Sequence, residues 1–116
     1  MNQWGLAAVA CLMAQVAWGH AFLDRASPAV GSEVSGSPSA ISLTYTEPVE
    51  PLFSTIEVTD SRGVRVDNGK PVAQAEGRVL MVGLKPLSPG VYTVVWHITS
   101  VDTHKTNGHF SFTVKP

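Results

Sequence analysis

The stretch Tyr92-Thr93-Val94-Val95-Trp96-His97-Ile98 decides the fold class, because every second residue in it is large and apolar. Side chains of a β-strand point alternately to opposite faces, so this period predicts a strand with one buried face and one face toward solvent. A second stretch of the same kind, Phe110-Ser111-Phe112-Thr113-Val114, lies near the C-terminus. The two stretches predict a hairpin of two long antiparallel strands that turns through residues 101–106.

Further runs with the same period occur earlier in the chain, and turn signals separate them. Apolar and polar residues alternate over 41–46 and 56–59, whereas residues 60–63, 67–69 and 86–90 are rich in Asp, Asn, Gly and Pro. We expect strands at about 21–26, 40–47, 53–59, 64–66, 78–83, 90–100 and 107–115. Short strands spaced in this way are typical of one all-β domain, here a seven-stranded antiparallel Greek-key β-sandwich or barrel.

The start of the chain has the layout of a secretory signal peptide. Residues 6–17 form an apolar run with one interruption, and no charged side chain lies in or before this run. Small residues stand at the −3 and −1 positions of a cut before His20, and a cut after Ala21 satisfies the same rule. We therefore expect residues 1–19 to be a cleaved signal peptide and residues 20–116 to be the exported domain.

The composition excludes several function classes. The formal net charge is −1, with 8 Lys and Arg against 9 Asp and Glu, so the basic surface that nucleic-acid binding requires is missing. Hydrophobic residues make up 44% and charged residues 15%, which is unlike a disordered chain. The one cysteine, Cys11, lies in the expected signal peptide, so the exported domain can form neither a disulfide nor a thiolate metal site. Four histidines remain as candidate metal ligands.

Two segments carry histidines in positions that suit a metal ion. After a cut before it, His20 offers an imidazole and a free α-amine, which can chelate a metal through two nitrogens. Asp102 and His104 lie two residues apart in the turn between the long strands, where a carboxylate and an imidazole can converge. Three nitrogens and one oxygen suit Cu(II), with zinc as the second choice. The alternatives are an ordinary mature N-terminus and a turn whose histidine is solvated.

Six segments together resemble the copper-resistance CopC family. They are His20-Ala21-Phe22-Leu23, Ser27-Pro28-Ala29-Val30-Gly31-Ser32, Leu43-Thr44-Tyr45-Thr46-Glu47-Pro48-Val49, Tyr92-Thr93-Val94-Val95-Trp96, Ser100-Val101-Asp102-Thr103-His104 and Gly108-His109-Phe110-Ser111-Phe112. Each segment is modest alone, but their order and spacing are jointly specific and cover nearly all of the exported domain. The resemblance implies a periplasmic copper-binding protein with a seven-stranded Ig-like, or cupredoxin-like, sandwich.

The resemblance also implies roles for single residues and for partners. By position, His20, Asp102 and His104 would hold one Cu(II) per chain. Glu47 would lie near the site as an outer partner of a ligand, with a charged strand end as the alternative interpretation. The implied protein is a monomer that buffers copper or hands it to an inner-membrane copper transporter of the CopD type.

The chain departs from the family pattern at two places. Family members with a second, Cu(I), site carry a methionine-rich segment, because thioethers select Cu(I). The exported domain has only Met81, for which we expect a role in core packing, so the Cu(I) site is expected to be absent. Thr103 stands where the common family motif has glycine between the Asp and the His.

His97 and His109 fall outside this ligand set, on the expected outer faces of the two long strands. One register of the hairpin places them directly opposite each other, with Cβ atoms about 4.5 to 5.5 Å apart, and another makes them diagonal neighbours. An accessory two-histidine metal or proton-sensitive site is one interpretation, and two solvated imidazoles are the default.

Three functions compete on the sequence alone. The first is a Cu(II) carrier, the second is a histidine-brace copper monooxygenase, and the third is a metal-free Ig-like interaction domain. An N-terminal histidine paired with another histidine forms the brace, but such enzymes typically need a larger chain and an aromatic substrate platform. We expect the carrier, and therefore no enzymatic activity.

Overall fold

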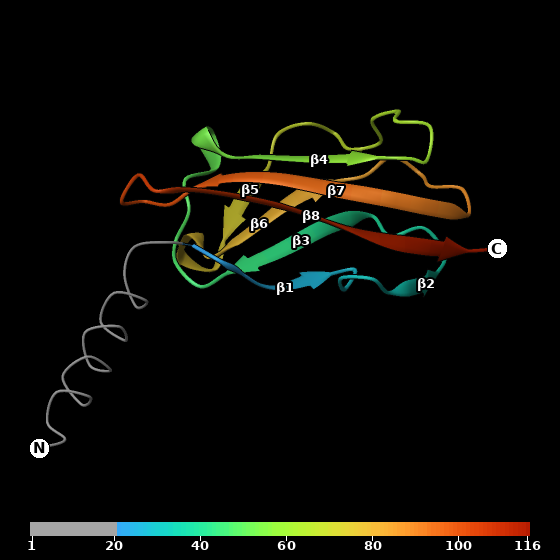
Figure 1. Ribbon diagram of the computed structural model, residues 1–116, viewed down its shortest axis with the longest axis horizontal. Coiled ribbons are helices and arrows are strands. Elements are labelled where there is room, and N and C mark those ends of the chain that lie inside the picture. Colours follow the sequence, from blue (N-terminus) through green and yellow to red (C-terminus); the bar gives the residue numbers. More distant parts are fainter. Residues whose placement is uncertain (1–20) are drawn as a thin grey trace, which may run out of the picture.

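The computed structural model describes residues 21–116, which form two four-stranded β-sheets with the core between them (Figure 1). One sheet has the order β1-β3-β6-β5 and the other has the order β2-β8-β7-β4. The strands are β1 (Leu23–Ser27), β2 (Glu33–Ser35), β3 (Ala40–Tyr45), β4 (Thr55–Thr59), β5 (Val72–Gln74), β6 (Val79–Gly83), β7 (Gly90–Thr99) and β8 (Lys105–Lys115). The 3-10 helices η1 (Pro51–Phe53) and η2 (Ala75–Gly77) lie in the connections. The expected signal peptide, residues 1–19, lies outside the described residues.

The period-two pattern of the sequence produces the core. Each long strand turns its large apolar residues toward the opposite sheet and its polar residues toward solvent, which removes a continuous apolar layer from water. The buried residues of β3, β7 and β8 are Ile41, Leu43, Tyr45, Tyr92, Val94, Trp96, Ile98, Phe110, Phe112 and Val114. The predicted all-β sandwich and the predicted inward faces are confirmed. None of the helices formed by residues 21–116 is long and apolar enough to span a membrane.

The β7–β8 hairpin is the longest pairing, running from Gly90 opposite Val114 to Thr99 opposite Lys105. Trp96 pairs with Gly108, and a Cβ atom at position 108 would lie 2.5 Å from Cζ2 of the indole. Glycine therefore lets the indole approach the β8 backbone, as glycine in a strand often does.

Six of the seven expected strands are present, and the strand count differs from the prediction. Residues 64–66 form no strand, because they cross between the sheets: Val66 N–H donates to Val58 O, and Lys85 N–H donates to Val66 O. The short edge strands β2 and β5 add two strands that the alternation did not reveal.

One pairing, β2 with β8, is parallel, so the fully antiparallel prediction is wrong there. Met81 is also not in the core, since it lies half-buried on the outer face of β6.

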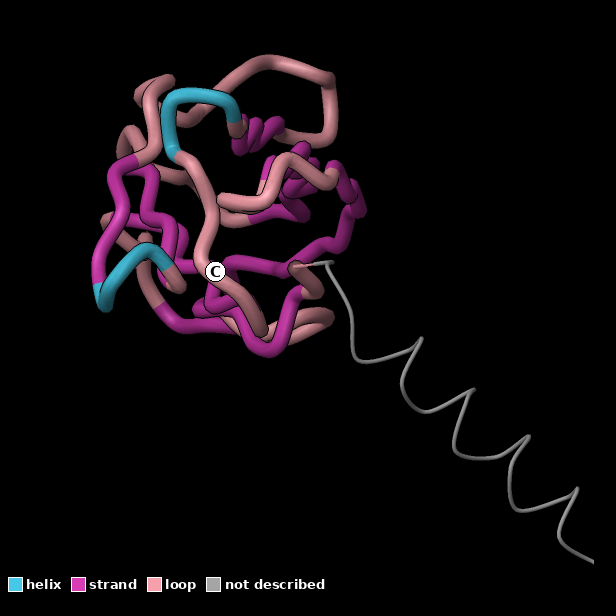
Figure 2. The backbone as a smooth tube through the Cα atoms, turned by 90° about the vertical axis from the view of Figure 1, so that its left-hand side faces the viewer, coloured by secondary structure: helices cyan, strands magenta, loops and turns pink. Residues whose placement is uncertain are grey.

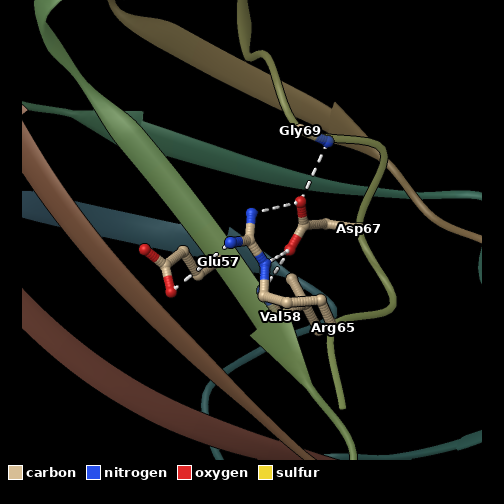
Figure 3. Close-up of polar contacts among 5 residues, drawn as sticks. All are labelled: Glu57, Val58, Arg65, Asp67 and Gly69. Atoms are coloured by element: carbon tan, nitrogen blue, oxygen red, sulfur yellow. Dashed lines mark hydrogen bonds and ion pairs between the residues drawn. The ribbon is translucent and has the colours of Figure 1, made fainter.

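A buried carboxylate ties the connection after β4 to β4 itself (Figure 3). The Asp67 side chain is 0% exposed. Its Oδ2 accepts hydrogen bonds from Val58 N–H (2.8 Å) and Arg65 Nε (2.7 Å), and its Oδ1 accepts from Arg65 Nη2 (2.8 Å) and Gly69 N–H (2.9 Å). Glu57 Oε1 lies 3.7 Å from Arg65 Nη1. Burial acts to raise the pKa of Asp67, but these hydrogen bonds and the charge of Arg65 outweigh it and lower the pKa.

Candidate metal centre

The first described residues are fixed at the end of the sandwich that carries the β7–β8 turn, at the left of Figure 1 and toward the viewer in Figure 2. Ala21 is buried, and its carbonyl accepts a hydrogen bond of 2.8 Å from Thr106 Oγ1 on β8. Phe22 N–H donates to Thr46 Oγ1, and Thr46 N–H donates to Phe22 O, at 2.9 Å each. These bonds hold the start of the domain against both β8 and the end of β3.

The segment that follows β3 crosses this same end and reaches the β7–β8 turn. Val49 forms an isolated β-bridge with Ser100, and Val101 N–H donates to Pro48 O at 3.1 Å. Glu47 is exposed and lies between the residue bonded to Phe22 and the residue bonded to Val101. Three segments that are far apart in the sequence therefore meet here: the start of the domain, residues 46–49 and the hairpin turn.

The hairpin turn is closed by two backbone hydrogen bonds of 2.9 Å. Ser100 N–H donates to His104 O, and Thr103 N–H donates to Ser100 O. A hairpin loop of three residues usually needs a left-handed backbone at its last position, where glycine is favoured. Thr103 occupies that position with φ of 74°. Thr103 therefore holds a backbone conformation that glycine adopts more readily.

This turn brings the carboxylate of Asp102 beside the imidazole of His104. Oδ1 of Asp102 lies 3.4 Å from Nδ1 of His104, and each side chain is about half exposed, at 53% and 52%. The hydroxyl of Ser100 donates a hydrogen bond to the same Oδ1. The Ser100 hydrogen bond, together with the hydrogen bond and charge of His104, holds the pKa of Asp102 below its ordinary value. An anionic oxygen and an imidazole nitrogen thus lie side by side and accessible from solvent.

The structure supplies only part of the expected ligand set. Among residues 21–116, no three side chains of His, Cys, Asp or Glu gather closely enough to hold a metal ion. Asp102 and His104 are brought together, whereas Glu47 does not form a cluster with them. His20 lies outside the described residues, immediately before the buried Ala21. The roles of His20, Asp102, His104 and Glu47 at a metal ion therefore stay predictions.

The hairpin register decides between the two placements left open for the other two histidines. His97 pairs with Asn107, and His109 pairs with Val95, so the histidines are not directly opposite each other. They are exposed diagonal neighbours on the outer face of the sheet, a relation in which Cα atoms lie about 7 to 8 Å apart. The loop that Ser100 and His104 close has only three residues, 101–103, so it is tighter than the expected turn through residues 101–106 and sets this pairing.

Sequence reasoning missed two hydroxyl side chains at this end. Ser100 contacts Asp102 and His104, and Thr106 fixes the carbonyl of Ala21. Serine or threonine occurs on six of the eight strands, so alternation does not indicate which hydroxyl reaches a distant segment. The position of Ser100 just before the Asp-x-His segment was the only available signal.

Comparison with known proteins gives a consistent result. Residues 23–115 match the CopC domain family. The chain is 38% identical over 100 residues to Protein YobA of Escherichia coli (strain K12), with 84% of this chain and 81% of YobA covered. It is 36% identical over 113 residues to Copper resistance protein C of Xanthomonas campestris pv. juglandis, with 91% and 88% covered. Copper transport protein CutJ of Bacillus subtilis (strain 168) is 31% identical over 117 residues, which span 97% of this chain but 22% of CutJ.

A solved structure shows the same architecture. CopC from Methylosinus trichosporium OB3b has a TM-score of 0.79 and 36% identity to this chain, with 84% of this chain and 95% of that chain covered. The agreement therefore extends from sequence to the arrangement of both sheets. Together with the match over residues 23–115, it shows that the chain belongs to the CopC family.

Proposed function

We propose that this protein is a periplasmic Cu(II)-binding protein that carries or buffers copper. The ligands of one Cu(II) per chain are the imidazole and α-amine of His20, the carboxylate of Asp102 and the imidazole of His104. The observation that carries the proposal is the placement of Asp102 Oδ1 3.4 Å from His104 Nδ1, at the end where the chain enters the domain.

The anchoring of Ala21 supports His20 as the further ligand. The carbonyl of Ala21 is hydrogen-bonded to Thr106, which follows His104 by only two residues. A residue directly before Ala21 thus joins the domain close to the Asp102–His104 pair. The α-amine of His20 is free only when residues 1–19 have been removed, so the proposal includes export and cleavage of the signal peptide.

The chemistry of this donor set favours Cu(II). Imidazole and amine nitrogens with a carboxylate oxygen suit Cu(II), which also stands highest among divalent ions in the Irving–Williams order. Thiolate ligands, which favour zinc or Cu(I), are not available, because Cys11 lies in the segment that we expect to be removed. The names of two relatives, Copper resistance protein C and Copper transport protein CutJ, support copper as the cargo.

A copper-transporting membrane protein of the CopD type is the proposed acceptor. This chain corresponds to 22% of CutJ, so in that relative a domain of this kind forms one part of a longer copper transport protein. We propose that the separate domain acts as a monomer without enzymatic activity and reaches its acceptor by diffusion. Glu47, exposed on the segment beside the turn, is proposed as an outer partner that orients a ligand.

A titration of the protein that begins at His20 tests this proposal. Cu(II) is added in competition with a chelator of known affinity, and the wild type is expected to bind one equivalent. His104→Ala should weaken binding by more than about tenfold, and Asp102→Ala should have a smaller effect. His97→Ala and His109→Ala are matched controls, because these exposed histidines lie on β7 and β8 outside the turn. Wild-type affinity in His104→Ala would refute the proposed ligand set.

A further inference from the structure

One buried hydroxyl contacts both described donor residues. Ser100 is 2% exposed and directly follows β7. Its Oγ donates a hydrogen bond to Asp102 Oδ1 and accepts one of 3.2 Å from His104 N–H. The backbone of Ser100 adds two more bonds, from its N–H to His104 O and from Thr103 N–H to its carbonyl. Ser100 therefore forms hydrogen bonds with Asp102, Thr103 and His104 and stabilises the turn.

We infer that Ser100 is a positioning residue for the metal site, which holds Asp102 and His104 in the arrangement that receives Cu(II). This inference rests on the proposed function and extends it to a residue that does not touch the metal. The Asp102 side chain is half exposed, so without a partner its carboxylate would rotate freely in solvent. A hydrogen bond to Oδ1 restrains that rotation before the metal arrives, and such pre-ordering raises affinity.

The burial of Ser100 makes this restraint rigid. The bridge to Val49 fixes its backbone against the segment after β3, so the hydroxyl sits on an ordered scaffold rather than on the turn itself. The His104 N–H that donates to the hydroxyl then ties the second ligand residue to the same atom. Removing the hydroxyl should leave both ligand residues in place along the chain but less well oriented.

Ser54 provides a matched control. It is also buried, at 5% exposed, and it stands beside the same end of β7. Its Oγ donates to Glu50 O at 2.7 Å and accepts from Thr99 N–H at 3.1 Å. Both of these bonds run to backbone atoms outside the turn. Ser54→Ala therefore removes a buried hydroxyl that, like the hydroxyl of Ser100, donates one hydrogen bond and accepts another. It leaves the hydrogen bonds of Asp102 and His104 unchanged.

The test compares Ser100→Ala with Ser54→Ala, using Cu(II) affinity by chelator competition and the electron paramagnetic resonance spectrum of bound Cu(II). Ser100→Ala should lose about tenfold in affinity and change the copper hyperfine splitting, as expected for an outer partner of a ligand. Ser54→Ala should lower the melting temperature while leaving affinity and spectrum at wild-type values. Ser100→Thr, which keeps a hydroxyl, should restore the wild-type spectrum, whereas the similarly shaped Ser100→Val should not. This second pair decides the question if Ser100→Ala does not fold.

A double-mutant cycle separates positioning from general destabilisation. In an Asp102→Ala background, most of the affinity loss caused by Ser100→Ala should disappear, because the hydroxyl acts mainly through that carboxylate. Fully additive losses, or a wild-type affinity and spectrum in Ser100→Ala, would overturn this inference alone. A wild-type protein that binds no Cu(II) would overturn the proposed function and this inference with it.

Discussion

At the scale of single residues, Thr103 is held in a backbone conformation that suits glycine, with φ of 74°. A left-handed backbone costs an L-residue about 1 to 2 kcal/mol, whereas the extra freedom of unfolded glycine costs about 0.5 to 1 kcal/mol. We expect Thr103→Gly to raise the free energy of unfolding by about 0.5 to 1 kcal/mol, measured by urea denaturation. Thr103→Ala keeps the Cβ atom and should bring no gain. A Thr103→Gly protein less stable than the wild type would show that the turn is not strained.

The proximity of Asp102 and His104 could be predicted from the sequence, but the structure brings the two residues together in a different way from the one expected. Alternate residues of an extended strand share a face, and that rule suggested the convergence. The structure instead brings the two together through a tight turn around the left-handed Thr103. The role of Ser100 could not be predicted, because it depends on a hydrogen bond that forms only when this turn closes.

At the scale of elements, the fit between β7 and β8 depends on Gly108. A Cβ atom there would approach the Trp96 indole to 2.5 Å, so the ring or the strand would have to move. Gly108→Ala should lower the free energy of unfolding by about 1 to 3 kcal/mol, the usual cost of overpacking, as measured by urea denaturation. Combining it with Trp96→Phe, which removes the outer ring, should recover part of this loss. If the two losses simply add, the clash is not the cause.

The Asp67 carboxylate should make the connection after β4 sensitive to acid. An unfolded aspartate has a pKa of about 3.9, and the folded pKa is lower. The stabilisation is therefore complete above the unfolded pKa and is lost as pH falls through the folded pKa. Asp67→Asn should reduce the free energy of unfolding by about 2 to 3 kcal/mol at neutral pH, because a buried, multiply bonded charge is removed.

Urea denaturation at neutral pH and at about pH 3 checks the Asp67 prediction, since the difference between variant and wild type should shrink in acid. Glu57→Gln is the control, because Glu57 is 46% exposed and lies 3.7 Å from the same Arg65. Its effect should stay below about 1 kcal/mol, as for other exposed ion pairs. A penalty for Asp67→Asn that is equal at both pH values would contradict the assignment.

The elements that could be predicted are the ones with one buried face. Five strands, β3, β4, β6, β7 and β8, could be predicted because burial on one side requires alternation. β1 was also predicted, although only Leu23 and Ala26 of this strand are half-buried. β5 is exposed along its whole length, and β2 has a single half-buried residue, so neither carries a pattern. The sequence left the register of the β7–β8 hairpin open for another reason. Alternation fixes the face of each residue but allows shifts of two residues, and only the turn selects among them.

At the scale of the whole molecule, the sandwich brings the start of the domain into contact with a strand near the C-terminus. The bond between Ala21 and Thr106 joins residues separated by 85 positions, and residues 46–49 lie beside both of their neighbourhoods. No short-range pattern in the sequence indicates that these segments meet. Only the resemblance to a family led us to expect that the start of the domain and the hairpin turn lie together. This meeting of distant segments supports the proposal that an N-terminal residue and the hairpin turn contribute to one copper site.

The most direct test of that site compares the Cu(II) affinity of a chain that begins at His20 with that of a chain carrying one glycine before His20. The extension turns the α-amine of His20 into an amide and leaves every described residue unchanged. We predict that the chain beginning at His20 binds one Cu(II) and that the extension weakens binding by more than about tenfold. Equal affinities for the two chains would contradict a copper site completed by the N-terminal amine of His20.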